Sequence, residues 1–115
     1  MKIPQTIKIG GKVYRVEVTD NLYLGPANVS AEIVYTDLVI RISPQAKGKM
    51  EADFVHELMH GILDHLGYKD HDEQHVDALA QALYMVIQDN PDLFDDDEIL
   101  TTPRVAPQEE KGTAR

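Results

Sequence analysis

Residues 56–60 read His-Glu-Leu-Met-His, and they lie within a run of apolar residues that has helical period from about residue 50 to residue 66. Residues i and i+4 of a helix lie one above the other, so His56 and His60 can reach one cation together. Glu57 is then held beside the cation without having to bind it. The alternative is an amphipathic helix with two partly exposed histidines. The spacing favours a metal-binding helix.

The chemistry that this pattern offers depends on which metal it holds. The chain has no cysteine, so the ligands must be histidine, aspartate or glutamate. Zinc with two histidines, a third ligand and an open position lowers the pKa of its bound water to near 7. A neighbouring carboxylate can accept the proton of that water. We therefore expect Zn²⁺ as the cofactor and Glu57 as the general base of a hydrolytic reaction.

A third ligand must come from residues that follow the motif. The candidates are Asp64, His65, His71, Glu73, His75 and Asp77. Asp64 lies one helical turn beyond His60, where it can bind the metal or accept a hydrogen bond from the imidazole of a ligand. Glu73 has a competing structural interpretation, because Asp70 followed by Glu73 resembles a capping box. Spacing alone leaves these alternatives open.

The residues before the motif have the pattern of β-structure. Ile7 and Ile9 alternate with polar residues, residues 10–11 are a Gly-Gly turn, and residues 13–18 form the returning strand. A second hairpin is expected over about residues 29–43, with its turn near Thr36 and Asp37.

A second helix is expected over about residues 73–88, after a polar loop, and Asn90-Pro91 ends it. Gly67 has the position of a C′ residue for the motif helix. We therefore expect an α+β fold, in which N-terminal antiparallel hairpins form a small sheet that packs on the motif helix and a second, C-terminal helix.

Composition and charge limit the domain organisation and the partners. We expect one domain over residues 1–94, followed by an acidic, disordered tail over residues 95–115. The net charge of −9 disfavours direct nucleic-acid binding. No apolar run approaches the length of a membrane span, and residues 1–4 do not begin a signal peptide. We therefore expect a cytoplasmic protein that is not a membrane protein.

Residues 56–65, His-Glu-Leu-Met-His-Gly-Ile-Leu-Asp-His, resemble the HELGHxLLGH segment of the ImmA/IrrE-type metallopeptidases. Residues 73–80, Glu-Gln-His-Val-Asp-Ala-Leu-Ala, are similar to the ExxANxFA helix of that family. Met59 stands in place of the usual glycine, and Asp77 in place of the usual asparagine. The resemblance implies a small zincin-like domain of the HExxH type.

The resemblance also implies residue roles and a substrate class. His56, His60 and Glu73 would bind zinc, and Glu57 would be the general base of a zinc-dependent metallo-endopeptidase. The substrate would be a protein, such as a DNA-binding repressor-like regulator. Residues 38–44 resemble the strand that leads into the family's active-site helix, and in zincin folds such an edge strand can pair with an extended substrate.

Peptide hydrolysis also needs a group that stabilises the oxyanion. The sequence offers Tyr35, Tyr68, His71 and His75 for this role and does not choose among them.

Two other functions fit parts of the sequence. Residues 60–71 are somewhat similar to the HGxLHLxGYDH segment of YbeY-type endoribonucleases, although Asp64 replaces an expected histidine and His71 falls one place late. The acidic charge disfavours an RNA substrate. The other alternative is a non-enzymatic regulatory or binding module, in which the zinc site is structural or vestigial.

Overall fold

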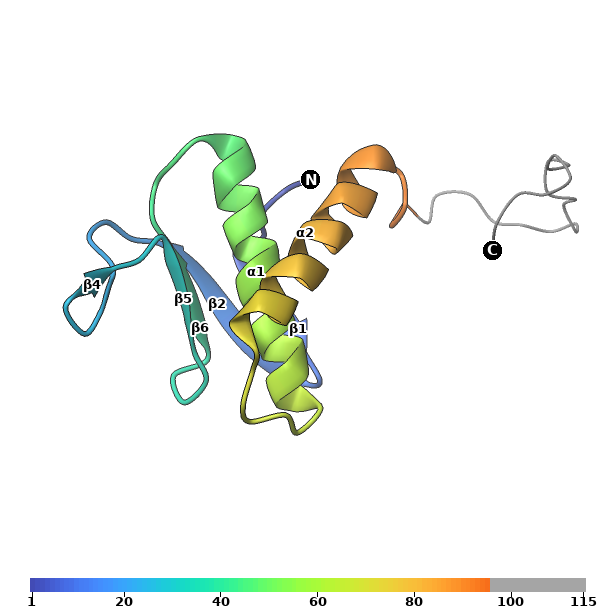
Figure 1. The fold of residues 1–115 in the computed structure, drawn as a ribbon. Helices are drawn as coiled ribbons and strands as arrows, with labels where there is room; N and C mark the ends of the chain where they lie inside the picture. Colours follow the sequence, from blue (N-terminus) through green and yellow to red (C-terminus); the bar gives the residue numbers. More distant parts are fainter. Residues whose placement is uncertain (96–115) are drawn as a thin grey trace, which may run out of the picture.

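The computed structural model describes residues 1–95 of the chain. Its elements, drawn in Figure 1, are β1 (Thr6–Ile9), β2 (Lys12–Val18), β3 (Tyr23–Leu24), β4 (Ala27–Asn28), β5 (Ala31–Val34), β6 (Val39–Ile42), α1 (Lys47–His65) and α2 (Glu73–Asp89). The predicted α+β class is therefore confirmed. The predicted tail lies outside the described residues, apart from Asp95. Within residues 1–95, no helix combines the length and apolar character that crossing a membrane requires.

Both predicted hairpins are present. β1 and β2 pair antiparallel, with Ile9 opposite Lys12. The two intervening glycines have φ values of 56° and 89°. Positive φ at both central positions is what a type I′ turn requires, and glycine adopts it without strain. β5 and β6 form the second antiparallel hairpin, with Val34 opposite Val39.

The sequence predicted antiparallel hairpins in a small sheet but not how the two hairpins pair with each other. The strand order is β1-β2-β6-β5, and β2 pairs with β6 in parallel, so the sheet is mixed. The connection from β2 to β6 is long enough for a parallel crossover because it contains the β3–β4 hairpin and β5. This order places β6 in the interior, where Val39, Ile40 and Ile42 are fully buried.

The strand order also corrects the expectation about the edge of the sheet. The segment 38–44 was expected to supply an edge strand, but β6 lies between β2 and β5. The edge strand is β5. Alternate residues of a strand point to opposite faces, so the burial of both Val39 and Ile40 shows that β6 is covered on both faces.

α1 lies between the sheet and α2 (Figure 1). Its Phe54 and Val55 are buried in the core together with Ile40 and Ile42 of β6. The helix ends at His65, and Gly67 is its C′ residue as predicted, with a φ of 94°. The Gly67 amide donates a hydrogen bond to the Asp64 carbonyl, and the Tyr68 amide donates one to the Leu63 carbonyl. Both bonds are 3.0 Å long. This pair of bonds is a Schellman motif.

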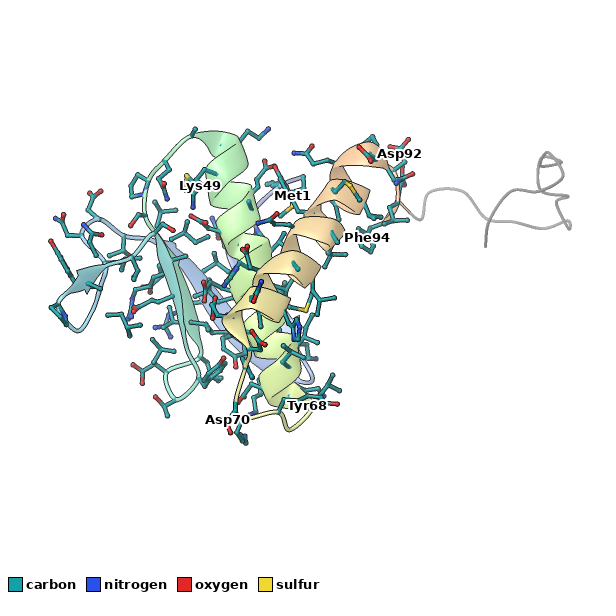
Figure 2. The ribbon with its side chains drawn as sticks, viewed as in Figure 1. Met1, Lys49, Tyr68, Asp70, Asp92 and Phe94 are labelled. Carbon is teal, nitrogen blue, oxygen red and sulfur yellow. The ribbon has the colours of Figure 1, made fainter. Side chains whose placement is uncertain are left out.

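The start of α2 corrects the predicted capping box. The N-cap is Asp72 and not Asp70. The Asp72 carboxylate accepts hydrogen bonds from the backbone amides of Gln74, at 3.0 Å, and His75, at 3.4 Å. Glu73 is therefore the first residue of the helix and has no capping role. Figure 2 shows Tyr68 and Asp70 in the loop that turns the chain from the end of α1 back to α2.

A buried hydrogen bond joins α1 to the distal part of α2. Glu51 of α1 is only 3% exposed, and the Tyr84 hydroxyl of α2 donates to its carboxylate over 2.8 Å. The other partner of this carboxylate is the exposed Lys47 ammonium, 3.8 Å away. The bond helps to set how α2 lies on α1, and therefore where Glu73 meets the motif helix.

Tyr84→Phe is expected to destabilise the fold by about 1–3 kcal/mol, because it leaves a buried carboxylate without its hydroxyl donor. Urea unfolding measures this free energy. Tyr23→Phe is the matched control, since Tyr23 is 55% exposed, and it should change the stability by less than about 0.5 kcal/mol. Equal stability of the two variants would contradict a bracing role for Tyr84.

Candidate metal centre

The structure brings the three predicted metal ligands together. His56 and His60 lie on one face of α1, and Glu73 reaches them from the first position of α2. One ligand atom from each of the three lies within 4.8 Å of the others. Glu73 Oε1 is 2.5 Å from His56 Nε2, and Glu73 Oε2 is 3.1 Å from His60 Nε2. Within residues 1–95, this is the group whose geometry suits a bound metal.

A chain of hydrogen bonds determines the tautomer of His60. His71 Nε2 lies 2.7 Å from the Tyr68 carbonyl oxygen, so it must carry a hydrogen and donate it. In a neutral His71 ring, Nδ1 is then an acceptor, and it lies 2.8 Å from His60 Nδ1. His60 therefore donates from Nδ1 and keeps a lone pair on Nε2, directed at Glu73. Burial lowers the pKa of His60, which favours this neutral ring.

A carboxylate lies beside the other ring nitrogen of His56. His56 Nδ1 lies 3.3 Å from Asp77 Oδ1, and Asp77 stands one turn after Glu73 on α2. A neutral His56 that carries its hydrogen on Nδ1, on the side of this carboxylate, would keep a lone pair on Nε2 for a metal. A histidine that donates its second ring N–H to a carboxylate is the usual arrangement around a bound metal.

In these tautomers the Nε2 atoms of His56 and His60 would offer lone pairs to a metal. Without a metal, both Nε2 atoms lie within hydrogen-bond distance of the Glu73 carboxylate. Burial raises the pKa of Glu73, but its bonds with the two histidines outweigh this, so the pKa is lowered overall and the carboxylate stays charged. Such lone pairs repel one another unless a proton or a cation lies between them. Two imidazole nitrogens and one carboxylate are a donor set that fits Zn²⁺.

Glu57 lies beside this group and outside it. It is 9% exposed, and it lines the same cleft as His56, His60 and Glu73. Burial raises the pKa of Glu57 to about 7, with His56 lowering it and Glu73 raising it. A carboxylate with a near-neutral pKa can both accept a proton and return it.

The remaining candidate ligands lie elsewhere. Asp64 forms an ion pair with Lys69 over 3.6 Å. The ring of His65 lies so close to Gly10, in the β1–β2 turn, that a Cβ there would clash with it. The side chain of His75 is 81% exposed. His71 contacts His60, and Asp77 contacts His56, but neither joins the group. The sequence offered both only as possible ligands or catalytic groups.

A cleft of about 730 Å³ opens beside the centre. One part of its lining is β5 with Leu24 from β3, and another is the group His56, Glu57, His60 and Glu73. The centre is therefore accessible to a large ligand that lies along the edge of the sheet.

The free edge of β5 borders this cleft. The Ser43 amide donates to the Ser30 carbonyl over 2.8 Å, so these two residues are a hydrogen-bonded pair of the β5–β6 hairpin. Bonded and non-bonded pairs alternate in an antiparallel ladder. The N–H and C=O groups of Ala31 and Ile33 therefore point away from β6. An extended chain can pair with them.

The raised pKa of Glu57 gives a stability prediction for the metal-free protein. The pKa rises from 4.5 to about 7 on folding, so the folded state holds this proton longer than the unfolded state does. Stability then falls as pH rises from about 4.5 to about 7, by about 3 kcal/mol in total, and stays at the lower value above it. Glu57→Gln should therefore stabilise the metal-free protein by about this amount near pH 8 and little near pH 4.5.

Urea unfolding in the presence of a chelator, repeated across this pH range, measures the effect. Parallel pH profiles for the wild type and Glu57→Gln would show that burial does not perturb the carboxyl group.

Comparisons with protein-family models, with curated proteins and with solved structures found no match for this chain. The relation to the ImmA/IrrE-type metallopeptidases therefore stays a hypothesis that rests on the two motif segments. The functional argument depends on the geometry of the centre itself.

Proposed function

We propose that this chain is a zinc-dependent metallo-endopeptidase with a zincin-like site. His56, His60 and Glu73 hold the metal, and Glu57 is the general base. The observation that carries the proposal is the convergence of His56, His60 and Glu73, whose ligand atoms lie within 4.8 Å of one another beside the buried Glu57 carboxyl group. A purely structural helix pair has no need of this combination.

The metal, when bound, would polarise the scissile carbonyl and acidify the attacking water. Glu57 accepts the proton of the water as its oxygen bonds to the carbonyl carbon. It then delivers that proton to the amide nitrogen as the C–N bond breaks. Asp77 and His71 hold the rings of His56 and His60 with Nε2 facing the centre.

The cleft supports a polypeptide substrate. The free backbone groups of Ala31 and Ile33 on β5 can bind an extended segment by strand addition. Strand addition recognises main-chain groups, which every protein offers. The apolar Leu24, which also lines the cleft, can contact a side chain of the bound segment. A regulator of the repressor type, as the family resemblance suggests, is one protein that could supply such a segment.

The direct test is peptide cleavage by the zinc-loaded chain. A library of peptides from a digested proteome is incubated with the protein, and mass spectrometry identifies new termini. We expect new termini that disappear when a chelator removes the metal and return when zinc is restored. A library with no zinc-dependent termini would contradict the proposal.

The ribonuclease alternative receives no support from the position of His71. In that interpretation His71 would be a ligand, but its Nδ1 contacts the ring of His60, and its Nε2 donates to a backbone carbonyl.

A further inference from the structure

Peptide hydrolysis places negative charge on the carbonyl oxygen. As the water oxygen bonds to the carbonyl carbon, one electron pair of the C=O bond moves onto the oxygen. A hydrogen-bond donor aimed at that oxygen stabilises the transition state, and in a partly dry site its effect is large. The residues described so far accept protons or hold the metal. The donor must come from another side chain.

The structure separates the four candidates that the sequence offers. Tyr68 lies in the loop after α1 (Figure 2). It is 61% exposed and does not line the cleft. Both ring nitrogens of His71 are engaged, one with His60 and one with a backbone carbonyl. The side chain of His75 is 81% exposed. Tyr35 is the candidate that lines the cleft together with the metal-binding group and Glu57.

The hydroxyl group of Tyr35 is available to a ligand. Its residue is partly buried, and within residues 1–95 the hydroxyl forms no hydrogen bond. Burial, followed by the charges of Asp64 and Glu57, raises the pKa of Tyr35 to about 12. A phenol with a raised pKa is protonated near neutral pH and can donate a hydrogen bond.

The position of Tyr35 in the fold also fits this role. It directly follows the edge strand β5, where the Val34–Val39 pair closes the hairpin ladder. Leu38 turns the chain back into β6 with a φ of 53°. A peptide that pairs with the free edge of β5 therefore meets the Tyr35 side chain and Glu57 in the same cleft.

We propose that the Tyr35 hydroxyl donates a hydrogen bond to the oxyanion that forms during peptide hydrolysis. This inference rests on the proposed function, and it assigns to Tyr35 a catalytic role that acts on the substrate oxygen. The proton stays on the phenol throughout, so Tyr35 is distinct from Glu57, which transfers protons.

The test compares Tyr35→Phe with the wild type on a peptide that the zinc-loaded wild type cleaves. We expect kcat to fall about 100-fold, with KM and zinc content unchanged, because the lost bond is made chiefly in the transition state. Tyr23→Phe is the matched control, since Tyr23 is 55% exposed on β3 and does not line the cleft. It should keep the wild-type kcat.

A second readout does not depend on turnover. A phosphinic analogue of the same peptide carries a tetrahedral centre with an oxygen where the oxyanion forms. Calorimetry should show that Tyr35→Phe binds this analogue about 100-fold more weakly. In the Glu57→Gln background, the intact peptide should bind equally well with Tyr35 or with Phe at this position.

The outcomes separate this inference from the proposed function. A cleaving wild type whose Tyr35→Phe variant retains its kcat and its affinity for the analogue would overturn the inference alone. Loss of zinc or of fold in Tyr35→Phe, with equal weakening of the intact peptide, would show a structural role and also overturn it. A zinc-loaded wild type that cleaves no peptide would overturn the proposed function, and the inference with it.

Discussion

Glu57→Gln is expected to retain zinc and to lower the rate of peptide hydrolysis by at least about 100-fold. Glutamine has nearly the same shape as glutamate, but its amide cannot accept the proton of the attacking water. Glu57 lies outside the group of ligand atoms, so the substitution removes no metal–ligand bond and zinc should be retained. Zinc content by elemental analysis and kcat on a cleaved peptide measure the two effects separately.

Glu51→Gln is the matched control for this experiment. Glu51 is also a buried glutamate of α1, but it is bonded to Tyr84 and does not line the cleft. The control should keep the wild-type kcat. Loss of zinc in Glu57→Gln would make Glu57 a ligand, and full hydrolysis would remove it as the base. A cellular activity that persists in Glu57→Gln would favour the non-enzymatic regulatory module.

Glu73→Ala is expected to weaken zinc binding by about 100-fold or more, because it removes one of three protein ligands. His71→Ala and Asp77→Ala should weaken it by about 10–100-fold, since they orient the ligand rings without binding the metal. Competition with a chromophoric zinc chelator measures these affinities. The order of the effects distinguishes a ligand from the residues that position ligands.

His75→Ala controls for changes in the first turn of α2. His75 lies two residues after Glu73, its side chain is 81% exposed, and its removal should leave the zinc affinity unchanged. Full zinc retention by Glu73→Ala would contradict the assignment of the third ligand. Asp64, His71 or Asp77 would then have to supply it.

Local patterns predicted both hairpins of the four-stranded sheet and both helices, but not the short β3–β4 hairpin. The Gly-Gly turn and the alternation around it specify the first hairpin, and Gly67 ends α1 where a C′ glycine should. The parallel pairing of β2 with β6 is a long-range contact, which no local pattern encodes. One signal was present, because residues 39–42 are nearly all apolar, and a continuous apolar run is typical of a strand buried on both faces.

In the candidate site too, features set by local geometry were predictable from sequence, and features set by long-range packing were not. The spacing of His56 and His60 places both rings on one face because helical geometry is local. The position of Glu73 depends on which aspartate caps α2, and Asp72 and Asp70 are both plausible from sequence. The contacts of His71 with His60 and of Asp77 with His56 depend on the path of the loop after α1 and on how α2 packs on α1. The spacing of Asp77 from Glu73 already placed those two residues on one face of α2.

The central claim is that one zinc ion is bound jointly by His56, His60 and Glu73. X-ray absorption at the zinc edge tests it directly on protein that has been loaded with zinc and dialysed. The account predicts about one zinc per chain, with two nitrogen ligands at about 2.0–2.1 Å and carboxylate oxygen at about 2.0–2.2 Å. Failure to retain zinc, or an unchanged spectrum when both histidines are replaced by alanine, would contradict it.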